Sequence, residues 1–311
     1  MLLVTLHGGK PRTNPHKNNV HAHDEDGKKI SSGVLGGSGE ILLDELRSIY
    51  LARKYLYVVN ANKNQNSVLC YKGSGTQYKF VGPFVSKATC KGIEHPFDMT
   101  FDDVGHCYLS SQDTNIVTRL NVSADGTRAT AAPQAPALPA NGKFYPGTFV
   151  ASSVGNLGST TTVVKPPAGL EYSGSGAKKH SVRGVVWANN ALYVADEPAG
   201  KVKVYDKDGR FLGQSNVVES PVHLMARKGS LYVSGGNEVL TAKLPNPPGN
   251  FKLSPIKGVK VKNGCGMAFT KSGDFYIASR TENIILKFDS DFNPIDFQCK
   301  LTDNPEFLLH V

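Results

Sequence analysis

Hydrophobic and polar residues alternate in short paired runs that recur along the chain. In one copy the run Leu-Tyr-Val-Ala-Asp at residues 192–196 is followed by a polar turn and by Lys-Val-Lys-Val-Tyr-Asp at residues 201–206. Two β-rich runs joined by a polar turn predict a hairpin. Further copies begin at Leu56, Cys107, Leu231 and Phe275. Helical periodicity is not found over a convincing length, so the pattern predicts an all-β protein.

Apolar runs on both sides of each hairpin extend it to four antiparallel strands. A short apolar run comes before it, as at residues 182–187, and a turn with a weaker strand follows, as at residues 211–213. The tyrosines Tyr193, Tyr232 and Tyr276 recur at intervals of 39 and 44 residues. This period is typical of a four-stranded propeller blade. We therefore expect a β-propeller built from four-stranded antiparallel blades.

The two ends of the chain predict one further blade. Residues 305–311 have the pattern of a first strand with nothing after it, and residues 2–6, 20–23 and 29–35 have the pattern of the three strands that would follow. Joining them would close the ring and protect the edges of the sheets. The expected domain spans residues 1–311, with the last blade completed by both chain ends.

Residues 131–180 interrupt the repeat and leave the number of blades open. The segment is rich in Pro and Gly, and the tyrosines on either side of it, Tyr108 and Tyr193, are 85 residues apart. It is either an irregular insertion in a six-bladed ring or, with residues 148–152 as its middle, a degenerate seventh blade. Proline cannot donate to a β-ladder, so a Pro-rich segment is unsuited to an innermost strand. We therefore favour six blades.

The repeat resembles a known family. The runs at residues 192–196 and 201–206 and the Lys-Asp-Gly-Arg turn at residues 207–210 resemble NHL repeats, over about residues 41–130 and 180–301 and the split blade. The resemblance implies a propeller. NHL-like propellers include protein-interaction modules, an amidating lyase, virginiamycin B lyase and relatives of gluconolactonase, so the resemblance does not select an activity. The Leu-Trp-Phe-Thr-Glu and Glu-Gly-Pro motifs associated with two of these enzymes are missing.

Charge and cysteine content limit the kinds of binding partner and the cellular compartment that we expect. The net charge of +9 is dispersed, without a dense basic run interleaved with aromatic residues, so a nucleic-acid partner is not expected. The five cysteines are odd in number and lack CxxC spacing, which favours buried free thiols in a reducing compartment. The apolar run at residues 1–7 is too short for a signal peptide, and a membrane span needs about 18 apolar residues. We expect a cytoplasmic monomer that binds no membrane.

Candidate site residues come from the loops that enter the innermost strands and from the turns after the second strands. Six of these could converge on one mouth of the central channel: His7, His95, Asp98, Arg183, His223 and Glu306. His95 and His223 with Asp98 could act as general acid and base, and Arg183 could hold an anionic group. The set His7, His95, His223 and Glu306 would suit a divalent ion such as Ca, Mg or Zn.

Each candidate also has a structural interpretation. His95 could be a turn residue before Pro96, His223 could line the channel with ordinary hydrogen bonds, and Arg183 could pair with a carboxylate. His21 and His23 alternate onto one face of a strand, which favours ligand binding, but that strand is expected far from the channel, at the surface or between blades.

Two functions follow from the sequence. The first is a hydrolase or lyase, with or without a metal, acting on a small molecule at the channel mouth, with residues 131–180 as a lid. The second is a non-catalytic propeller that binds a protein partner. GxSxG, P-loop, GxGxxG and HExxH motifs are missing from the sequence, so no motif decides between them.

Overall fold

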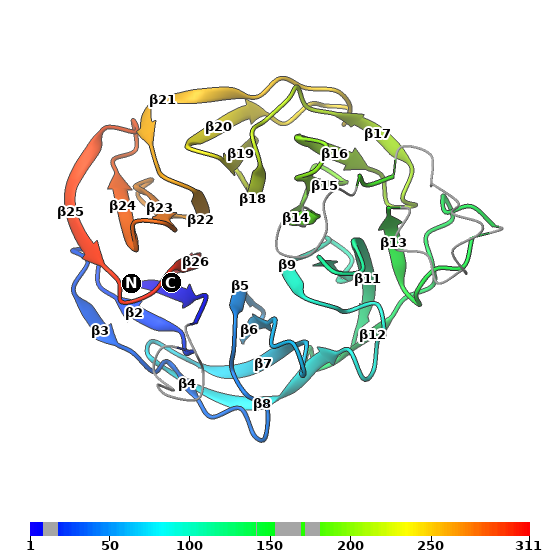
Figure 1. Cartoon of the computed structure of the whole chain (residues 1–311), viewed down its shortest axis with the longest axis horizontal. Coiled ribbons are helices and arrows are strands. Elements are labelled where there is room, and N and C mark those ends of the chain that lie inside the picture. The colour runs from blue at the N-terminus through cyan, green and yellow to red at the C-terminus, as the bar shows by residue number, and fades with distance from the viewer. Residues whose placement is uncertain (9–17, 141, 153–168, 172–180) are drawn as a thin grey trace.

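The protein is a ring of six small β-sheets (Figure 1), seen in a computed structural model that describes residues 1–8, 18–140, 142–152, 169–171 and 181–311. The described residues contain strands and no helix. This confirms the predicted all-β, six-bladed propeller with antiparallel blades. Among the described residues no helix is long and apolar enough to cross a membrane.

The blades follow one another in chain order. Blade 1 contains β5 (Leu46–Ala52), β6 (Tyr55–Asn60), β7 (Ser67–Ser74) and β8 (Gln77–Ser86), with β4 (Leu35–Gly36) parallel to β8 at its outer edge. Blade 2 contains β9 (Pro96–Phe101), β10 (Cys107–Ser111), β11 (Ile116–Val122) and β12 (Ala129–Ala131). Blade 3 contains β14 (Val182–Ala188), β15 (Ala191–Asp196), β16 (Lys201–Tyr205) and β17 (Phe211–Gln214). Blade 4 contains β18 (Pro221–Arg227), β19 (Ser230–Gly235), β20 (Glu238–Lys243) and β21 (Ser254–Lys260). Blade 5 contains β22 (Gly264–Phe269), β23 (Phe275–Ser279), β24 (Ile284–Phe288) and β25 (Pro294–Lys300).

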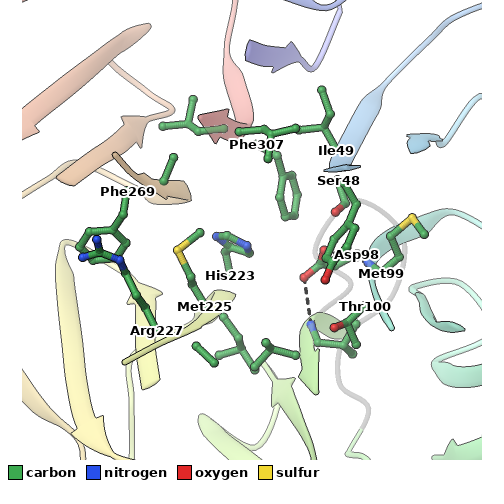
Figure 2. A pocket seen from close by; sticks show the side chains of 18 of the residues that line it. Ser48, Ile49, Asp98, Met99, Thr100, His223, Met225, Arg227, Phe269 and Phe307 are labelled. Atoms are coloured by element: carbon green, nitrogen blue, oxygen red, sulfur yellow. Dashed lines mark hydrogen bonds between the residues drawn. The ribbon is translucent and has the colours of Figure 1, made fainter. Parts of the chain in front are cut away.

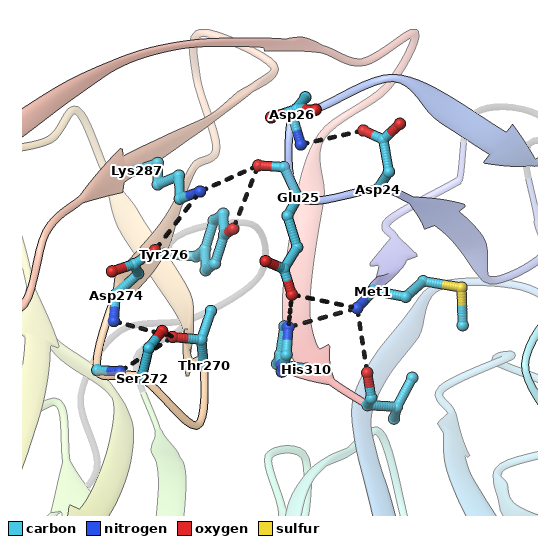
Figure 3. Close-up of polar contacts among 12 residues, drawn as sticks. Met1, Asp24, Glu25, Asp26, Thr270, Ser272, Asp274, Tyr276, Lys287 and His310 are labelled. Atoms are coloured by element: carbon cyan, nitrogen blue, oxygen red, sulfur yellow. Dashed lines mark hydrogen bonds and ion pairs between the residues drawn. The ribbon is translucent and has the colours of Figure 1, made fainter.

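Blade 6 is built from both ends of the chain, as predicted. Its inner strand β26 (Pro305–His310) pairs with β1 (Leu2–Leu6), which is followed by β2 (His21–His23) and β3 (Lys29–Ser31). The Met1 amino group donates to the Val311 carbonyl at 3.1 Å. Figure 3 shows further contacts at this closure, where Glu25 accepts a hydrogen bond from Lys287 of blade 5 at its backbone oxygen (3.1 Å). The ring is therefore closed by a β-ladder between the two termini.

The hydrophobic core consists of layers between neighbouring blades. The repeated tyrosines Tyr57, Tyr108, Tyr193 and Tyr276 are buried on the second strands of their blades. Tyr57, for example, packs in a cluster with Met99 of the next blade. Because both faces of each sheet are covered by a neighbour, the blades depend on the closed ring for their burial. The five cysteines are buried and form no disulfide, as expected.

The interruption of the repeat is not a seventh blade. β13 (Thr148–Ala151) pairs with the first half of β11, while β12 pairs with its second half. The two short strands thus share the outer edge of blade 2, and Phe149 of β13 packs on Tyr108 with ring centroids 4.9 Å apart. Much of the predicted lid, at residues 153–168 and 172–180, lies outside the described residues.

Candidate functional site

The six inner strands approach one another around the channel, and their sequences are adapted to this. A Cβ on Gly184 would lie 2.6 Å from the Val222 carbonyl oxygen, and one on Gly266 would lie 2.4 Å from the Phe307 Cα. Only glycine allows these strands to come so close. Elsewhere a side chain bridges the gap: Thr100 accepts a hydrogen bond from the Trp187 amide at 3.2 Å.

Two aromatic rings separate the two ends of the channel. Phe97 of β9 and Phe307 of β26 are both buried and meet edge to face, with centroids 5.4 Å apart. At one end, the guanidinium groups of Arg47 and Arg183 lie over Phe97 at 5.8 and 5.2 Å. At the other end, Phe307 forms part of the wall of a cavity. We call the end with Arg47 and Arg183, where the inner strands begin, the charged mouth. We call the cavity at the other end the channel cavity.

Glu306 is the centre of the charged mouth. Its carboxylate is fully buried and lies 2.7 Å from Arg47 Nη1 and 2.8 Å from Arg280 Nη2. Burial acts to raise the pKa of Glu306, but the two guanidinium groups outweigh it and hold the pKa below its usual value. These contacts are ion pairs rather than aligned hydrogen bonds, since Glu306 Oε1 has no hydrogen-bond partner among the described residues. Glu306 is thus committed to two arginines from blades 1 and 5.

His95 lies between two carboxylates of the same mouth. Its Nε2 is 3.3 Å from Glu45 and its Nδ1 is 3.5 Å from Asp113. Burial acts to lower the pKa of His95, but the hydrogen bonds to Asp113 and Glu45 outweigh it and raise the pKa. In turn His95, followed by Arg47, lowers the pKa of Glu45 to about 2. With a φ of 51° before Pro96, His95 also forms the predicted turn.

Arg183 and His7 complete the predicted residues at this mouth. Arg183 Nε is 2.7 Å from Glu197 Oε2, and the other oxygen of Glu197 accepts from the Ser220 hydroxyl at 2.8 Å. His7 Nδ1 contacts its neighbour Gly8 at the backbone oxygen (3.3 Å). The predicted residues of the charged mouth are therefore held by protein partners.

The channel cavity has a volume of about 380 Å³ and is lined by the C-terminal halves of the inner strands (Figure 2). Asp98 forms one wall and is almost fully buried. Its oxygens accept hydrogen bonds from the amides of Met99 at 2.8 Å and Val185 at 3.0 Å. Burial raises the pKa of Asp98 to about 7, against the opposing hydrogen bonds from Ser48 and these amides. Asp98 can therefore accept or donate a proton near neutral pH.

His223 faces the same cavity from blade 4. Its Nδ1 lies 3.1 Å from the Met267 amide nitrogen, which can only donate, so the ring proton is assigned to Nε2. Burial lowers the pKa of His223 to about 3, so the imidazole is neutral at physiological pH. Within the described part of the chain, Nε2 has no hydrogen-bond partner. In Figure 2, His223 and Asp98 lie on either side of Phe307 and point into the cavity.

The remaining wall is mixed apolar and polar. Trp187 and Met225 line it, and the Arg227 guanidinium lies 4.5 Å from the ring centroid of Phe269. Arg227 also donates to the Thr270 carbonyl at 3.0 Å. Trp187 is the single tryptophan of the chain and therefore a site-specific fluorescence reporter.

Several cavity residues occupy the same position in their inner strands, and this shared position is a signal in the sequence from which the cavity could have been predicted. In four of the six inner strands the third residue lines the cavity: Ser48, Asp98, His223 and Phe307. The other two strands have Gly184 and Gly266 at this position. The second residues include Arg47, Arg183 and Glu306 of the charged mouth. The sequence pattern points to Asp98 and His223 but not to Ser48, whose place on the cavity follows only when the six inner strands are aligned by position.

The prediction that six residues converge on one mouth is therefore wrong. Asp98 and His223 line the channel cavity, whereas the other four lie at the charged mouth: His7, His95, Arg183 and Glu306. Among the described residues, no group of three or more His, Cys, Asp or Glu could hold a metal ion. The predicted metal ligands His7, His95, His223 and Glu306 thus do not form a site, because Glu306 is held by arginines and His223 belongs to the cavity.

Comparisons with known proteins establish the fold alone. Family models and curated proteins gave no match. A chain of the nidogen–laminin complex is similar in structure, with a TM-score of 0.60 and 12% identity over 99% of this chain and 97% of that one. The periplasmic gluconolactonase PpgL of Pseudomonas aeruginosa has a TM-score of 0.58 and 14% identity, with the same coverages of 99% and 97%. A protein from Lactobacillus plantarum has a TM-score of 0.58 and 14% identity over 97% of this chain and 82% of that one.

Proposed function

We propose that the channel cavity binds a small uncharged ester or lactone and hydrolyses it through Asp98 and His223. The observation that carries this proposal is the pairing of two unlike groups on one cavity of about 380 Å³. One is a carboxyl group whose pKa is raised to about 7 by burial, and the other is a neutral imidazole whose N–H has no hydrogen-bond partner among the described residues. Such a pair can supply a base and a hydrogen-bond donor at neutral pH.

The proposed reaction uses each group at a defined atom. The substrate carbonyl oxygen accepts a hydrogen bond from His223 Nε2, which stabilises the negative charge that develops there. The Asp98 carboxylate takes a proton from water, and the water oxygen bonds to the carbonyl carbon. When the carbonyl re-forms, the bond to the leaving oxygen breaks and that oxygen takes the proton from Asp98. The products are a carboxylic acid and an alcohol, and Asp98 is again ionised.

The walls of the cavity suit an uncharged substrate. Phe307 and Met225 present apolar surface, and Arg227 is already engaged by Phe269 and Thr270. Apolar walls with a few oriented polar groups are the usual composition of a small-molecule site. The name of PpgL as a gluconolactonase guides the choice of lactones as first probes, within a likeness that shows the fold alone. The NHL-type assignment, the cytoplasmic location and the monomeric state stay predictions beside this proposal.

Hydrolysis of p-nitrophenyl acetate and δ-valerolactone, together with quenching of Trp187 fluorescence, would test the proposal. We expect Asp98→Asn to lower kcat/KM by roughly 10²-fold or more, the usual contribution of a general base. Asp113→Asn is the matched control, because it removes a carboxylate from the charged mouth instead. Thermal unfolding would show that both variants are folded.

Full activity in a folded Asp98→Asn protein would overturn the assignment of the base. If no ester or lactone is hydrolysed and none changes the Trp187 fluorescence, the result would instead favour the alternative, a non-catalytic propeller that binds a protein partner.

A further inference from the structure

A second cavity lies at the outer side of the ring, between blades 6 and 5, and is independent of the proposed hydrolysis. Its volume is about 260 Å³, several times the roughly 30 Å³ that a water molecule occupies in the liquid. It is lined by His21, His23, Gly27, Lys29, Lys300, Leu301 and Thr302. These lining residues are lysines, histidines that can take a proton, and neutral residues, and none of them has a carboxylate.

His23 carries the strongest sign of a missing ligand. It is 2% exposed, and its Nδ1 lies 3.2 Å from the Gly27 carbonyl oxygen, so Nδ1 is the atom that donates. Its Nε2 is buried and has no hydrogen-bond partner among the described residues. Buried polar atoms are rarely left without a partner in folded proteins. An anion in the cavity would supply one, because His23 could take a proton and donate it from Nε2.

We propose that this cavity binds a tetrahedral oxyanion, the phosphate or sulfate group of a free ion or of a small ester. Lys29, Lys300 and Thr302 line the cavity, and their ammonium and hydroxyl groups would be the donors to this oxyanion. Charge-assisted hydrogen bonds to such an oxyanion are among the strongest that proteins make.

Two of the groups beside the cavity, Cys299 and Asp24, are unsuited to binding a metal cation. Burial lowers the pKa of His23, the hydrogen bond to Gly27 opposes this shift and the charge of Lys29 adds to it, so the pKa lies below its usual value. Cys299 Sγ lies 3.4 Å from His23 Nδ1, and burial raises the pKa of this thiol to about 12, so it stays neutral. The nearby Asp24 carboxylate accepts hydrogen bonds from the amides of Asp26 and Lys28, at 3.1 and 2.8 Å, and so stabilises the turn in which it lies.

Calorimetric titration of the full chain with sodium phosphate, glycerol 3-phosphate and sodium sulfate, at ionic strength held constant with NaCl, would test the proposal. We expect saturable binding that Lys29→Met and Lys300→Met each weaken by roughly tenfold, the effect of losing one charge-assisted hydrogen bond. Lys28→Met is the matched control: it removes an exposed lysine beside Lys29 that does not line the cavity, and binding should be unchanged. Equal binding of phosphate and glycerol 3-phosphate would identify an ester-accepting site, and phosphate alone a free-ion site.

Three results would overturn the proposal: heats no larger than those with NaCl, an equal loss in Lys28→Met, or stoichiometric binding of ZnCl₂ without binding of oxyanions. The role of His23 has a separate readout. Sulfate does not titrate near neutral pH, so its binding should tighten from pH 8 to pH 6 as His23 takes a proton. His23→Asn keeps a donor for Gly27 and should remove this dependence; a pH-independent wild type would exclude His23 from the site.

Discussion

The two ends of the channel contain the same kinds of residue in opposite states. At the charged mouth, Glu306 is matched by Arg47 and Arg280, and His95 is matched by Glu45 and Asp113. In the channel cavity, the Asp98 carboxyl and the His223 imidazole instead lie on either side of Phe307, and their hydrogen bonds come from backbone amides and from Ser48 rather than from charged groups. One end is held together by its charges, and the other keeps its ionisable groups available.

The pKa values of Glu306 and Asp98 shift in opposite directions and illustrate this contrast. Both carboxyl groups are buried on neighbouring levels of the inner strands, and burial acts to raise the pKa of each. Two guanidinium groups reverse this for Glu306, whereas Ser48 and two amides are too weak to reverse it for Asp98. The charge that faces a buried acid, rather than the burial itself, decides whether it stabilises the fold or can exchange a proton.

The largest effect should come from breaking the charged mouth. Glu306→Gln removes the fully buried carboxylate that the buried Arg47 shares with the partly exposed Arg280, and it leaves Arg47 only the partly exposed Glu45. Removing one partner of a buried pair costs about 3–5 kcal/mol. Urea unfolding would measure this loss in the free energy of unfolding. Glu282→Gln, which removes an exposed partner of Lys262, should cost less than about 1 kcal/mol. Equal losses in the two variants would remove the distinction between the buried and exposed pairs.

A second experiment separates the chemistry of the cavity from its architecture. In His223→Asn the amide oxygen can still accept from Met267, but the N–H that faces the cavity is lost. We expect kcat/KM for ester hydrolysis to fall by roughly 10²-fold, as for loss of one oxyanion donor. His95→Asn, at the charged mouth, should leave the rate unchanged. A rate lost equally in both variants would contradict the division between the two ends.

The pH dependence of hydrolysis should report Asp98. As a base, Asp98 must be ionised, so kcat/KM should rise about tenfold per pH unit below the pKa of about 7 and level off above it. Ser48→Ala removes a hydrogen bond that lowers this pKa, so the midpoint should move to higher pH. A flat profile from pH 5 to pH 9 would exclude Asp98 as the base. Because the pKa of His223 is about 3, the imidazole adds no second limb in this range.

The smallest expected effect concerns His95 and stability. Its pKa is raised in the folded protein, so its stabilising contribution is complete below the unfolded pKa and is lost as pH rises through the folded pKa. Wild type should therefore exceed His95→Asn in free energy of unfolding at pH 5.5 by more than at pH 8.5. Since His95 is partly exposed, the difference should stay below about 1 kcal/mol. Urea unfolding at the two pH values would measure it, and a larger difference at pH 8.5 would reverse the assigned direction.

Much of the fold was predictable because its signals are local. Alternation at residues 192–206 predicts a hairpin, and the register Leu192↔Tyr205 to Asp196↔Lys201 is the one that alternation requires. The unmatched strands at the two chain ends predicted the closing blade. The prolines of residues 131–180 correctly indicated that this segment is not a seventh blade. The pairing of β13 with β11 could not be predicted from the sequence of β13.

The site was predictable only in part. Asp98 and His223 were identified as channel residues, but they were assigned to the wrong end, because a difference of one residue along an inner strand moves a side chain from one level of the channel to the next. The ion pairs of Glu306 join three blades and leave no spacing signal in the chain.

By itself, the sequence determined the strand pattern, the blade repeat, the closure and the list of ionisable residues near the channel, since each depends on neighbours in the chain or on the repeat period. The tertiary structure alone decided which of those residues are paired and which remain open to a cavity. Pairing depends on distances between side chains of different blades, and the pKa of a buried group depends on the charges within a few ångströms of it. Those distances exist only once the ring has closed.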